Sequence, residues 1–457
     1  MMPGRCMSRR AYGQRVVAWV GGGVAAGALA ACGWAPQAAA PKADAQPVQI
    51  HYSYWATGTS GAVQEDWVKM FNAKGGRVRV TTSQVTQDYW GTMTAQAVAG
   101  SGADLWMGQS ERFPELAARG LAQSVERYFK RDAKSLNTDD FVPNALEQYR
   151  FHTERRLMFQ GDTFAIPYMT TLEMFYYNLD AIQQAGAKLP PRDGNWTWDD
   201  FLTLAKAVTK VKADQTLEKA AFFLHTGWIY HLPWLWSFGG DYFNKDFTRW
   251  TLDSPEARAA FQTYVDYRHK HHVAPIPGKD FVGANATDLF FDGTVAIWIC
   301  NTGCQIVMQD RQAAFRWDIA HMPKGKAGPA NFHAADALLV SSASKHVEAA
   351  WEFMKYSVSP EAEERYGREG IHMPSRKSVV NKVFVRPGTP WTEEINLEAL
   401  KYARLRPLTA DYFYYNQVMN KYFAQMINNE IAVPDALVRI QQAVDYILKN
   451  HDLPGQY

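Results

Sequence analysis

Hydroxyl groups and aromatic rings gather in one stretch of the chain, Phe164–Asp180, with the sequence FAIPYMTTLEMFYYNLD. Pro167 removes a backbone hydrogen-bond donor, so we expect two short strands around a break rather than one long element. Tyr168 and Thr170 follow the proline at this break. Such side chains can bind a polar ligand, and they can equally belong to a core strand with buried tyrosines. The residue types alone leave both interpretations open.

A second group of candidates follows the predicted strands of the N-terminal part. The segments that alternate or cluster apolar residues in this part are 48–55, 78–85 and 103–107. Helical segments separate them, and strands that alternate with helices predict a mostly parallel sheet. In an open sheet of this kind, ligands bind beyond the carboxyl ends of the strands. Trp55, Gln109 and Glu111 stand at such ends and are candidate ligand contacts.

Tryptophan is abundant in this chain, with 16 residues. Three of them, Trp228, Trp234 and Trp236, crowd one segment with glycine on both sides. An indole face can stack on the apolar face of a pyranose ring while the ring edges stay open for hydrogen bonds. At least one of the three is expected to be such a platform, with Trp228 and Trp236 as candidates and the remainder in the core. Trp298, in a later predicted strand, is a further candidate.

The first 32 residues are typical of an export signal. Ser8-Arg9-Arg10 precedes an uncharged, glycine-rich run, and Leu29-Ala30-Ala31-Cys32 resembles a bacterial lipobox in which Cys32 becomes the lipidated first residue. The arginine pair resembles the signal for the twin-arginine route. The alternative is an ordinary secretory leader with a chance arginine pair. Residues 33–47 are rich in Ala and Pro and are expected to form a flexible tether.

Removing the leader changes the charge balance. The leader holds four arginines and no acidic residue, which leaves 44 basic against 46 acidic residues and a formal net charge of −2. The chain has no run of Lys or Arg that would suit a nucleic acid, and no later apolar run long enough for a membrane helix. We therefore expect no nucleic-acid partner, and membrane contact through the lipid anchor only. The length suits two sizeable domains.

The remaining motifs give no catalytic or metal site. Asp199 and Asp200 follow Thr197 at a predicted helix start, where capping and the helix dipole explain the acidic pair. A nucleophile motif such as GxSxG is missing from the sequence. Cys300 and Cys304 can form a disulfide in an oxidising compartment, with free thiols as the alternative. We predict neither a metal nor a cofactor.

Six short sequence motifs occur in a specific order along the chain. They are FAIPYMTTLEMFYYNLD, WTWDDF, FGGD, LFFDGTVAIW, SASKHVEAAWEFMKY and GIHMP. In this order they resemble the extracellular solute-binding proteins of family 1, the sugar-binding components of ABC importers. The resemblance covers nearly all of residues 48–457. The lipobox agrees with it, because such receptors are often tethered near their permease.

The resemblance implies an α/β protein with the two-lobe, type II periplasmic-binding-protein fold, in which mostly parallel sheets flanked by helices enclose a ligand cleft. The chain would cross between lobes at Thr171–Met174, Pro323–Phe332 and Ser357–Met373. Lobe one would hold 48–170 and 328–360, and lobe two would hold 171–325 and 375–457. The implied function is capture of a mono- or oligosaccharide, without catalysis, and its delivery to a membrane permease. A monomer in the bacterial cell envelope is expected.

By the same resemblance, several positions match those at which the family contacts its ligand. They are Trp55, Gln109, Glu111, Tyr168, Thr170, Trp228, Asn301 and Thr302. Asp336 stands where the family commonly has a glycine pair, so its carboxylate either joins the site or caps a strand. Trp298 and the cysteines around Asn301 also depart from the family pattern. These departures leave the identity of the ligand open.

Two other kinds of function stay open at this point. An envelope glycan hydrolase or lyase would also need an aromatic cleft and carboxylates. A receptor for a non-sugar ligand, such as glycerol phosphate or a polyamine, is possible within the same family. Trp55, Glu111 and Asp336 favour a neutral or cationic ligand over an anionic one.

Overall fold

Two large β-sheets organise the part of the chain that this computed structural model describes, residues 46–455 apart from 226 and 385–393. Both sheets belong to one compact unit, Gln46–Tyr457. The first sheet has the strand order β14-β7-β13-β3-β1-β2, with β15 also paired to β13. Its strands are β14 (Met373–Pro374), β7 (Pro167–Thr171), β13 (Asn331–Val340), β3 (Leu105–Gln109), β1 (Val48–Tyr54), β2 (Val78–Gln84) and β15 (Ala403–Leu405).

The helices that pack around the first sheet come from the N-terminal part of the chain and from the segment after β13. They are α1 (Gly58–Ala73), α2 (Tyr89–Val98), α3 (Phe113–Ala118), α4 (Glu126–Leu136), α11 (Val347–Ser357) and α12 (Pro360–Arg368). Strand β1 pairs in parallel with β2 and β3. This agrees with the predicted alternation of strands and helices, and it brings the carboxyl ends of β1 and β3 to one edge of the sheet.

The second sheet has the strand order β12-β8-β11-β10-β9. Its strands are β12 (Trp317–Ala320), β8 (Glu173–Asn178), β11 (Val295–Asn301), β10 (Leu217–Phe222) and β9 (Lys210–Val211). Its neighbouring helices are α5 (Leu179–Gln184), α6 (Trp198–Val208), α9 (Ala286–Phe291) and α10 (Cys304–Arg311). Helix α6 begins with the expected cap, because Thr197 and Asp200 exchange hydrogen bonds in a capping box.

Both sheets are mixed, which differs from the expectation of mostly parallel sheets. Strand β8 runs antiparallel to both β11 and β12. In the first sheet, β13 runs antiparallel to β3 and β7. These antiparallel strands come from segments that leave one sheet and enter the other, and such a segment arrives without the crossover helix that a parallel neighbour needs.

The chain passes between the two sheets at short segments. Only Leu172 separates β7 from β8, and residues 321–330 separate β12 from β13. The third crossing lies later than the predicted Ser357–Met373. Helix α12 packs on α1 and α11, and β14 pairs with β7, so the chain still lies with the first sheet at Pro374.

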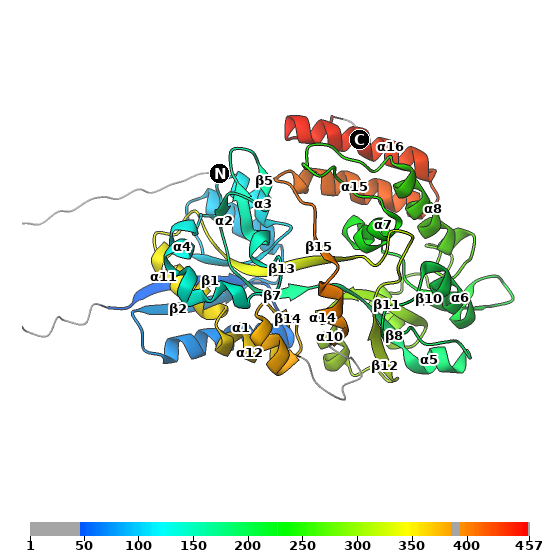
Figure 1. Ribbon diagram of the computed structural model, residues 1–457, viewed down its shortest axis with the longest axis horizontal. Helices are drawn as coiled ribbons and strands as arrows, with labels where there is room; N and C mark the ends of the chain where they lie inside the picture. Colours follow the sequence, from blue (N-terminus) through cyan, green and yellow to red (C-terminus); the bar gives the residue numbers. More distant parts are fainter. Residues whose placement is uncertain (1–45, 226, 385–393, 456–457) are drawn as a thin grey trace, which may run out of the picture. The chain divides into compact units, whose positions relative to one another are not determined.

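Helices also form a layer beside the second sheet. It contains α7 (Leu232–Phe238), α8 (Pro255–His269), α15 (Tyr412–Ile427) and α16 (Val433–Asn450), with α15 and α16 lying side by side in Figure 1. A three-stranded sheet consists of β5 (Leu157–Met158), β4 (Arg150–His152) and β6 (Asp162–Thr163). The other elements are η1 (Thr138–Asp140), η2 (Leu146–Tyr149), η3 (Trp228–His231), α13 (Lys377–Val379), η4 (Val380–Phe384) and α14 (Glu394–Leu400).

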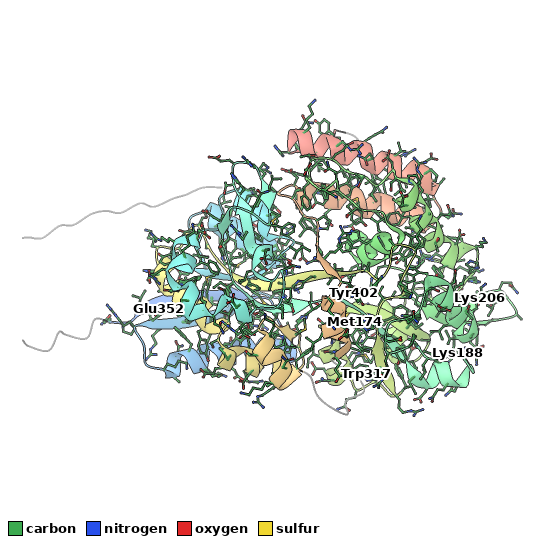
Figure 2. The ribbon with its side chains drawn as sticks, viewed as in Figure 1. Met174, Lys188, Lys206, Trp317, Glu352 and Tyr402 are labelled. Atoms are coloured by element: carbon green, nitrogen blue, oxygen red, sulfur yellow. A yellow bond between two sulfur atoms is a disulfide. The ribbon has the colours of Figure 1, made fainter. Side chains whose placement is uncertain are left out.

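A separate hydrophobic cluster lies between the second sheet and α14. Met174 and Trp317 belong to this cluster, and Tyr402 packs against it; all three are labelled in Figure 2. Ile395 and Ala399 of α14 are buried in the same cluster. Their burial fixes the C-terminal segment on the second sheet, immediately before β15 returns to β13 of the first.

Candidate functional site

A cavity of about 530 Å³ lies where the first sheet meets the loop that follows β11. Volumes of this size are typical of small-molecule sites. Five of the residues predicted from the sequence line it: Trp55, Gln109, Glu111, Asn301 and Asp336. The first three follow the carboxyl ends of β1 and β3, as expected for an open sheet.

Strand register explains how the cavity floor is formed. Asp336 of β13 is paired with Gln109 of β3 on one side and with Met169 of β7 on the other. Directly paired residues of neighbouring strands point to the same face of a sheet. All three side chains therefore reach the cavity, and Ala334 and Thr171 form the next pair on the same face.

Tyr168 and Thr170 do not line the cavity, which corrects the sequence-based expectation. Successive residues of a strand point to opposite faces, so Met169 and Thr171 face the cavity while their neighbours face the core. Tyr168 is fully buried, with its ring edge-on to Trp67 at 5.0 Å between centroids. The side chain of Thr170 is also fully buried.

Three further predicted contacts lie away from the cavity. Trp236 is buried on α7, where its indole N–H donates to Oδ1 of Asp241 at 2.9 Å. Trp298 is buried in the hydrophobic cluster behind β11, because it alternates with the residues of that strand that face the opposite side. Thr302 is buried beneath the site, where its hydroxyl contacts that of Thr171 at 2.9 Å.

Two predicted positions cannot be placed in the same way. Cys32 lies outside the described residues, and so does the side chain of Trp228, whose backbone belongs to η3. Tyr230 of the same short helix does line the cavity. Its ring stacks on that of His225 at 4.4 Å between centroids. The aromatic segment therefore contributes to the site through a residue that sequence reasoning did not select.

Arg406 is the main residue that sequence reasoning missed. Its guanidinium forms an ion pair with Glu111, and Nη2 also donates to Oγ of Ser110 at 3.3 Å. The same guanidinium lies over the ring of Phe332, 5.2 Å from its centroid. Arg406 is thereby fixed on the cavity wall by contacts with the segment after β3 and with strand β13, both far away in sequence.

Asp336 is the one predicted carboxylate whose environment is unusual. Within the described part of the chain its side chain has no hydrogen-bond or ion-pair partner. Burial raises the pKa of this carboxyl group well above its ordinary value, the nearby charge of Glu111 adds to the increase, and Arg406 opposes it. The side chain thus offers an unpaired carboxyl group to whatever enters the cavity.

Elements packed on the two different sheets contact each other beside the cavity. Oγ1 of Thr59, in α1, donates to Oδ1 of Asp310, in α10, at 3.2 Å. On another side, His372 reaches the loop after β11 so closely that a Cβ added to Gly303 would lie 2.0 Å from its Cε1. Burial lowers the pKa of His372 to about 4, so this imidazole is neutral at physiological pH.

The loop after β11 is held from several directions. Cys300 and Cys304 are joined by a disulfide, and Cys304 lines the cavity. The hydroxyl of Tyr176 donates to the backbone oxygen of Asn301 at 2.9 Å. The backbone N–H of Thr302 donates to the oxygen of Leu172, the residue between β7 and β8. Asn301 is therefore presented to the cavity by a constrained backbone.

The arrangement suits binding of a polyhydroxylated molecule. The half-buried ring of Trp55 is fixed by Tyr89 and Trp90, at 5.0 and 5.6 Å between ring centroids. Carboxylates and side-chain amides, which accept and donate hydrogen bonds, line the same space as this aromatic face. Among the residues that the structure describes, no group of three or more His, Cys, Asp or Glu is placed to hold a metal ion.

The family model for bacterial extracellular solute-binding proteins matches residues 66–396. The chain belongs to this family. It is a solute-binding protein of an ABC transporter, and the family consists of receptors rather than enzymes. Among curated relatives, a binding protein of Brucella abortus is 23% identical over 332 residues, which cover 70% of this chain and 74% of the relative. The lactose-binding protein of Rhizobium radiobacter is 26% identical over 166 residues, which cover 36% and 37%.

Solved structures show the same fold. The substrate-binding protein Lmo0181 of Listeria monocytogenes, in complex with cycloalternan, matches with a TM-score of 0.78 and 21% identity over 88% of this chain and 100% of that one. Maltose-bound MalE3 of T. maritima matches with a TM-score of 0.73 and 21% identity over the same shares. The solute-binding protein therefore has the α/β two-lobe periplasmic-binding-protein fold. None of the helices in the described ranges is long and apolar enough to cross a membrane.

Proposed function

We propose that this solute-binding protein captures a mono- or oligosaccharide between its two lobes and delivers it to a membrane permease. The observation that carries the proposal is the pairing of an aromatic face, Trp55, with the polar floor of Gln109 and Asp336 in one cavity. Aromatic faces pack on the C–H groups of a sugar ring, while carboxylates and amides bind its hydroxyls. The named ligands of similar proteins, lactose, cycloalternan and maltose, support the same class of ligand.

Contacts from both sheets support a closing mechanism. Trp55 and Asp336 come from the first sheet, and Asn301 follows a strand of the second. A ligand that binds both groups at once stabilises the closed arrangement over the open one. The segments that cross between the sheets, at Leu172 and at 321–330, are the candidates for bending.

The test of ligand class is calorimetric titration and thermal shift against a panel of mono- and oligosaccharides. We expect a bound sugar to raise the melting temperature and to be recovered intact. Trp55→Ala should weaken binding at least tenfold, whereas Tyr446→Ala, which removes an exposed ring of α16, should not change it. Failure of every sugar to bind, or release of a cleaved product, would contradict the proposal.

We also propose that the protein is exported and anchored to the cell envelope through Cys32. The support is the sequence Leu29-Ala30-Ala31-Cys32 and the tether 33–47 that follows it. Metabolic labelling with a fatty acid should label the wild-type protein and Cys6→Ser, whereas Cys32→Ser should lose the label. Retention of the label in Cys32→Ser would exclude this anchor.

A further inference from the structure

Carboxylates outnumber cations around the ligand cavity. The carboxylates that line it are Glu111, Asp310 and Asp336, and Arg406 is the single guanidinium on the described lining. His372 also lines the cavity but is neutral at physiological pH, since burial lowers its pKa to about 4. The described lining therefore has an excess of negative charge when its carboxyl groups are ionised.

Two of the three carboxylates already have partners. Glu111 is paired with Arg406. Asp310 accepts a hydrogen bond from the hydroxyl of Thr59 at 3.2 Å. For Asp336, the described residues provide neither an ion pair nor a hydrogen bond, although its neighbours Gln109 and Met169 are fixed by strand pairing. The carboxyl group without a described partner thus lies on the floor of the cavity, and its raised pKa means that its ionisation is unfavourable until a counter-charge binds.

The groups beneath Asp336 do not supply the missing donor. Four buried tyrosines lie close enough for its charge to raise their pKa values: Tyr52, Tyr149, Tyr168 and Tyr366. The hydroxyl of Tyr149 instead donates to the backbone oxygens of Gly108 and Ala335. The hydroxyl of Tyr52 donates to Gln64. Among the described contacts, no hydrogen bond joins Tyr168 or Tyr366 to Asp336 either, so the cavity is the side from which a ligand can supply the donor.

We propose that Asp336 selects a sugar that carries a protonated amine, an amino sugar or an amine-containing oligosaccharide. This inference rests on the proposed carbohydrate-binding function. An ammonium group would give the half-buried carboxylate both a counter-charge and a hydrogen bond, and such charge-assisted bonds are about twice as strong as neutral ones. A hydroxyl at the same position supplies a neutral donor only.

Anionic sugars fit the same cavity poorly. Arg406, the cation that a phosphate or uronate would need, is already held by Glu111 and by the ring of Phe332. An added anion would find no free cation on the described lining, whereas an ammonium group would favour the ionised form of Asp336. The expected order of affinity is therefore amine first, hydroxyl next and anion last.

Matched sugars that differ at one position provide the test. Calorimetry at pH 7 should compare glucose, N-acetylglucosamine and glucosamine, the corresponding galactose and mannose series, and the same series as oligosaccharides. We expect the amine member of the recognised series to bind at least tenfold more tightly than its hydroxyl counterpart. Asp336→Asn should abolish that preference, because asparagine retains the shape and an acceptor but cannot supply a counter-charge.

A matched control and three outcomes make the test decisive. Asp310→Asn neutralises another carboxylate of the same cavity, one that already has a partner, and should keep the amine preference. Equal affinity of the wild-type protein for amine and hydroxyl sugars would overturn the role of Asp336 while leaving carbohydrate binding intact. Tight binding of spermidine with no sugar bound would overturn both, as would failure of all the sugars. The comparison within the wild-type protein holds even if Asp336→Asn does not fold.

Discussion

Arg406 and Glu111 form an ion pair on the wall of the ligand cavity, joining the segment after β15 to the segment after β3. Their side chains are mostly buried, with exposed fractions of 8% and 19%. Nε of Arg406 is buried without a hydrogen-bond partner. Since little water reaches either group, each charge is stabilised mainly by the other, and removing one of them leaves the other without a counter-charge.

Replacing Arg406 with methionine should destabilise the protein by about 3 kcal/mol, because removal of one partner leaves a buried charge without its counter-charge. Urea denaturation of the purified protein measures the change. The double variant Arg406→Met/Glu111→Gln should recover part of the loss, since it removes the stranded carboxylate as well.

An exposed pair provides the matched control for this prediction. Arg311 and Asp288 are ion-paired at 2.7 Å, with side chains 41% and 61% exposed. Arg311→Met should cost less than about 1 kcal/mol, as is typical of surface salt bridges. Equal losses of unfolding free energy in Arg311→Met and Arg406→Met would show that burial of the Arg406–Glu111 pair adds nothing to its effect on stability.

Sequence reasoning located the right strand near the cavity but chose the wrong face of it. Two short strands did form, β7 and β8, but the break between them is at Leu172, whereas Pro167, where the break was predicted, begins β7. Within β7, however, Tyr168 and Thr170 face the core, while Met169 and Thr171 face the cavity. Residue chemistry favoured the hydroxyl side chains as ligand contacts. Alternation along the strand, however, decides which residues face the cavity. Whether these are the odd or the even positions depends on how β7 pairs with β13, which a single sequence does not reveal.

The order of elements was easier to predict than the contacts between distant ones. The alternation in β1 and the capping residues of α6 are local signals, and both elements formed where expected. Arg406 had no such signal. Its place on the cavity depends on β15 pairing with the start of β13, across about 70 residues of sequence. Tertiary pairing of that kind leaves no local pattern.

Glu173 predicts a pH dependence of stability. Its carboxylate is fully buried, both oxygens have no hydrogen-bond partner, and burial raises its pKa from 4.5 to about 8. Because the folded protein holds this proton more tightly than the unfolded chain, the contribution of Glu173 to stability should be fully present below pH 4.5 and be lost as the pH rises to 8. Glu173→Gln should remove that loss, with a ceiling of about 5 kcal/mol at pH 8, since each pKa unit corresponds to about 1.4 kcal/mol.

Glu363 is the matched control for the pH prediction. It is also buried, with a pKa raised to about 8, but its carboxylate accepts hydrogen bonds from the hydroxyl of Ser375 and from the backbone N–H of Arg376. Glu363→Gln replaces one acceptor with a donor, so it should be less stable than wild type at pH 5 and gain less at pH 8. Thermal melts of both variants between pH 5 and pH 8 give the comparison; a Glu173→Gln curve parallel to wild type would contradict the prediction.

Gly303 should tolerate no side chain while His372 is present. An alanine Cβ at this position would lie 2.0 Å from Cε1 and 2.4 Å from Nε2 of the imidazole, so the loop or the ring has to move. Gly303→Ala should cost about 1–3 kcal/mol, as overpacking typically does, and should weaken ligand binding through the displaced Asn301. Chemical denaturation and calorimetry measure the two effects.

Removing the imidazole tests whether the clash is the cause. In the His372→Ala background, Gly303→Ala should cost much less than it does alone. Gly76→Ala serves as a control, because a Cβ at Gly76 meets no atom within 4 Å. A full loss from Gly303→Ala in the His372→Ala background would mean that the imidazole is not what excludes the methyl group.

The disulfide between Cys300 and Cys304 should stabilise the loop that presents Asn301 to the ligand. The cross-link closes a short loop, for which restriction of the unfolded chain contributes about 2 kcal/mol. Cys300→Ser/Cys304→Ser should melt at a lower temperature and bind ligand more weakly, because Asn301 and Gly303 both line the cavity beside the bridge. A reductant should produce the same shift in the wild-type protein and none in the double variant. Unchanged ligand affinity alongside a lowered melting temperature would assign the bridge to stability alone, since Tyr176 and Leu172 would then suffice to hold the loop in place.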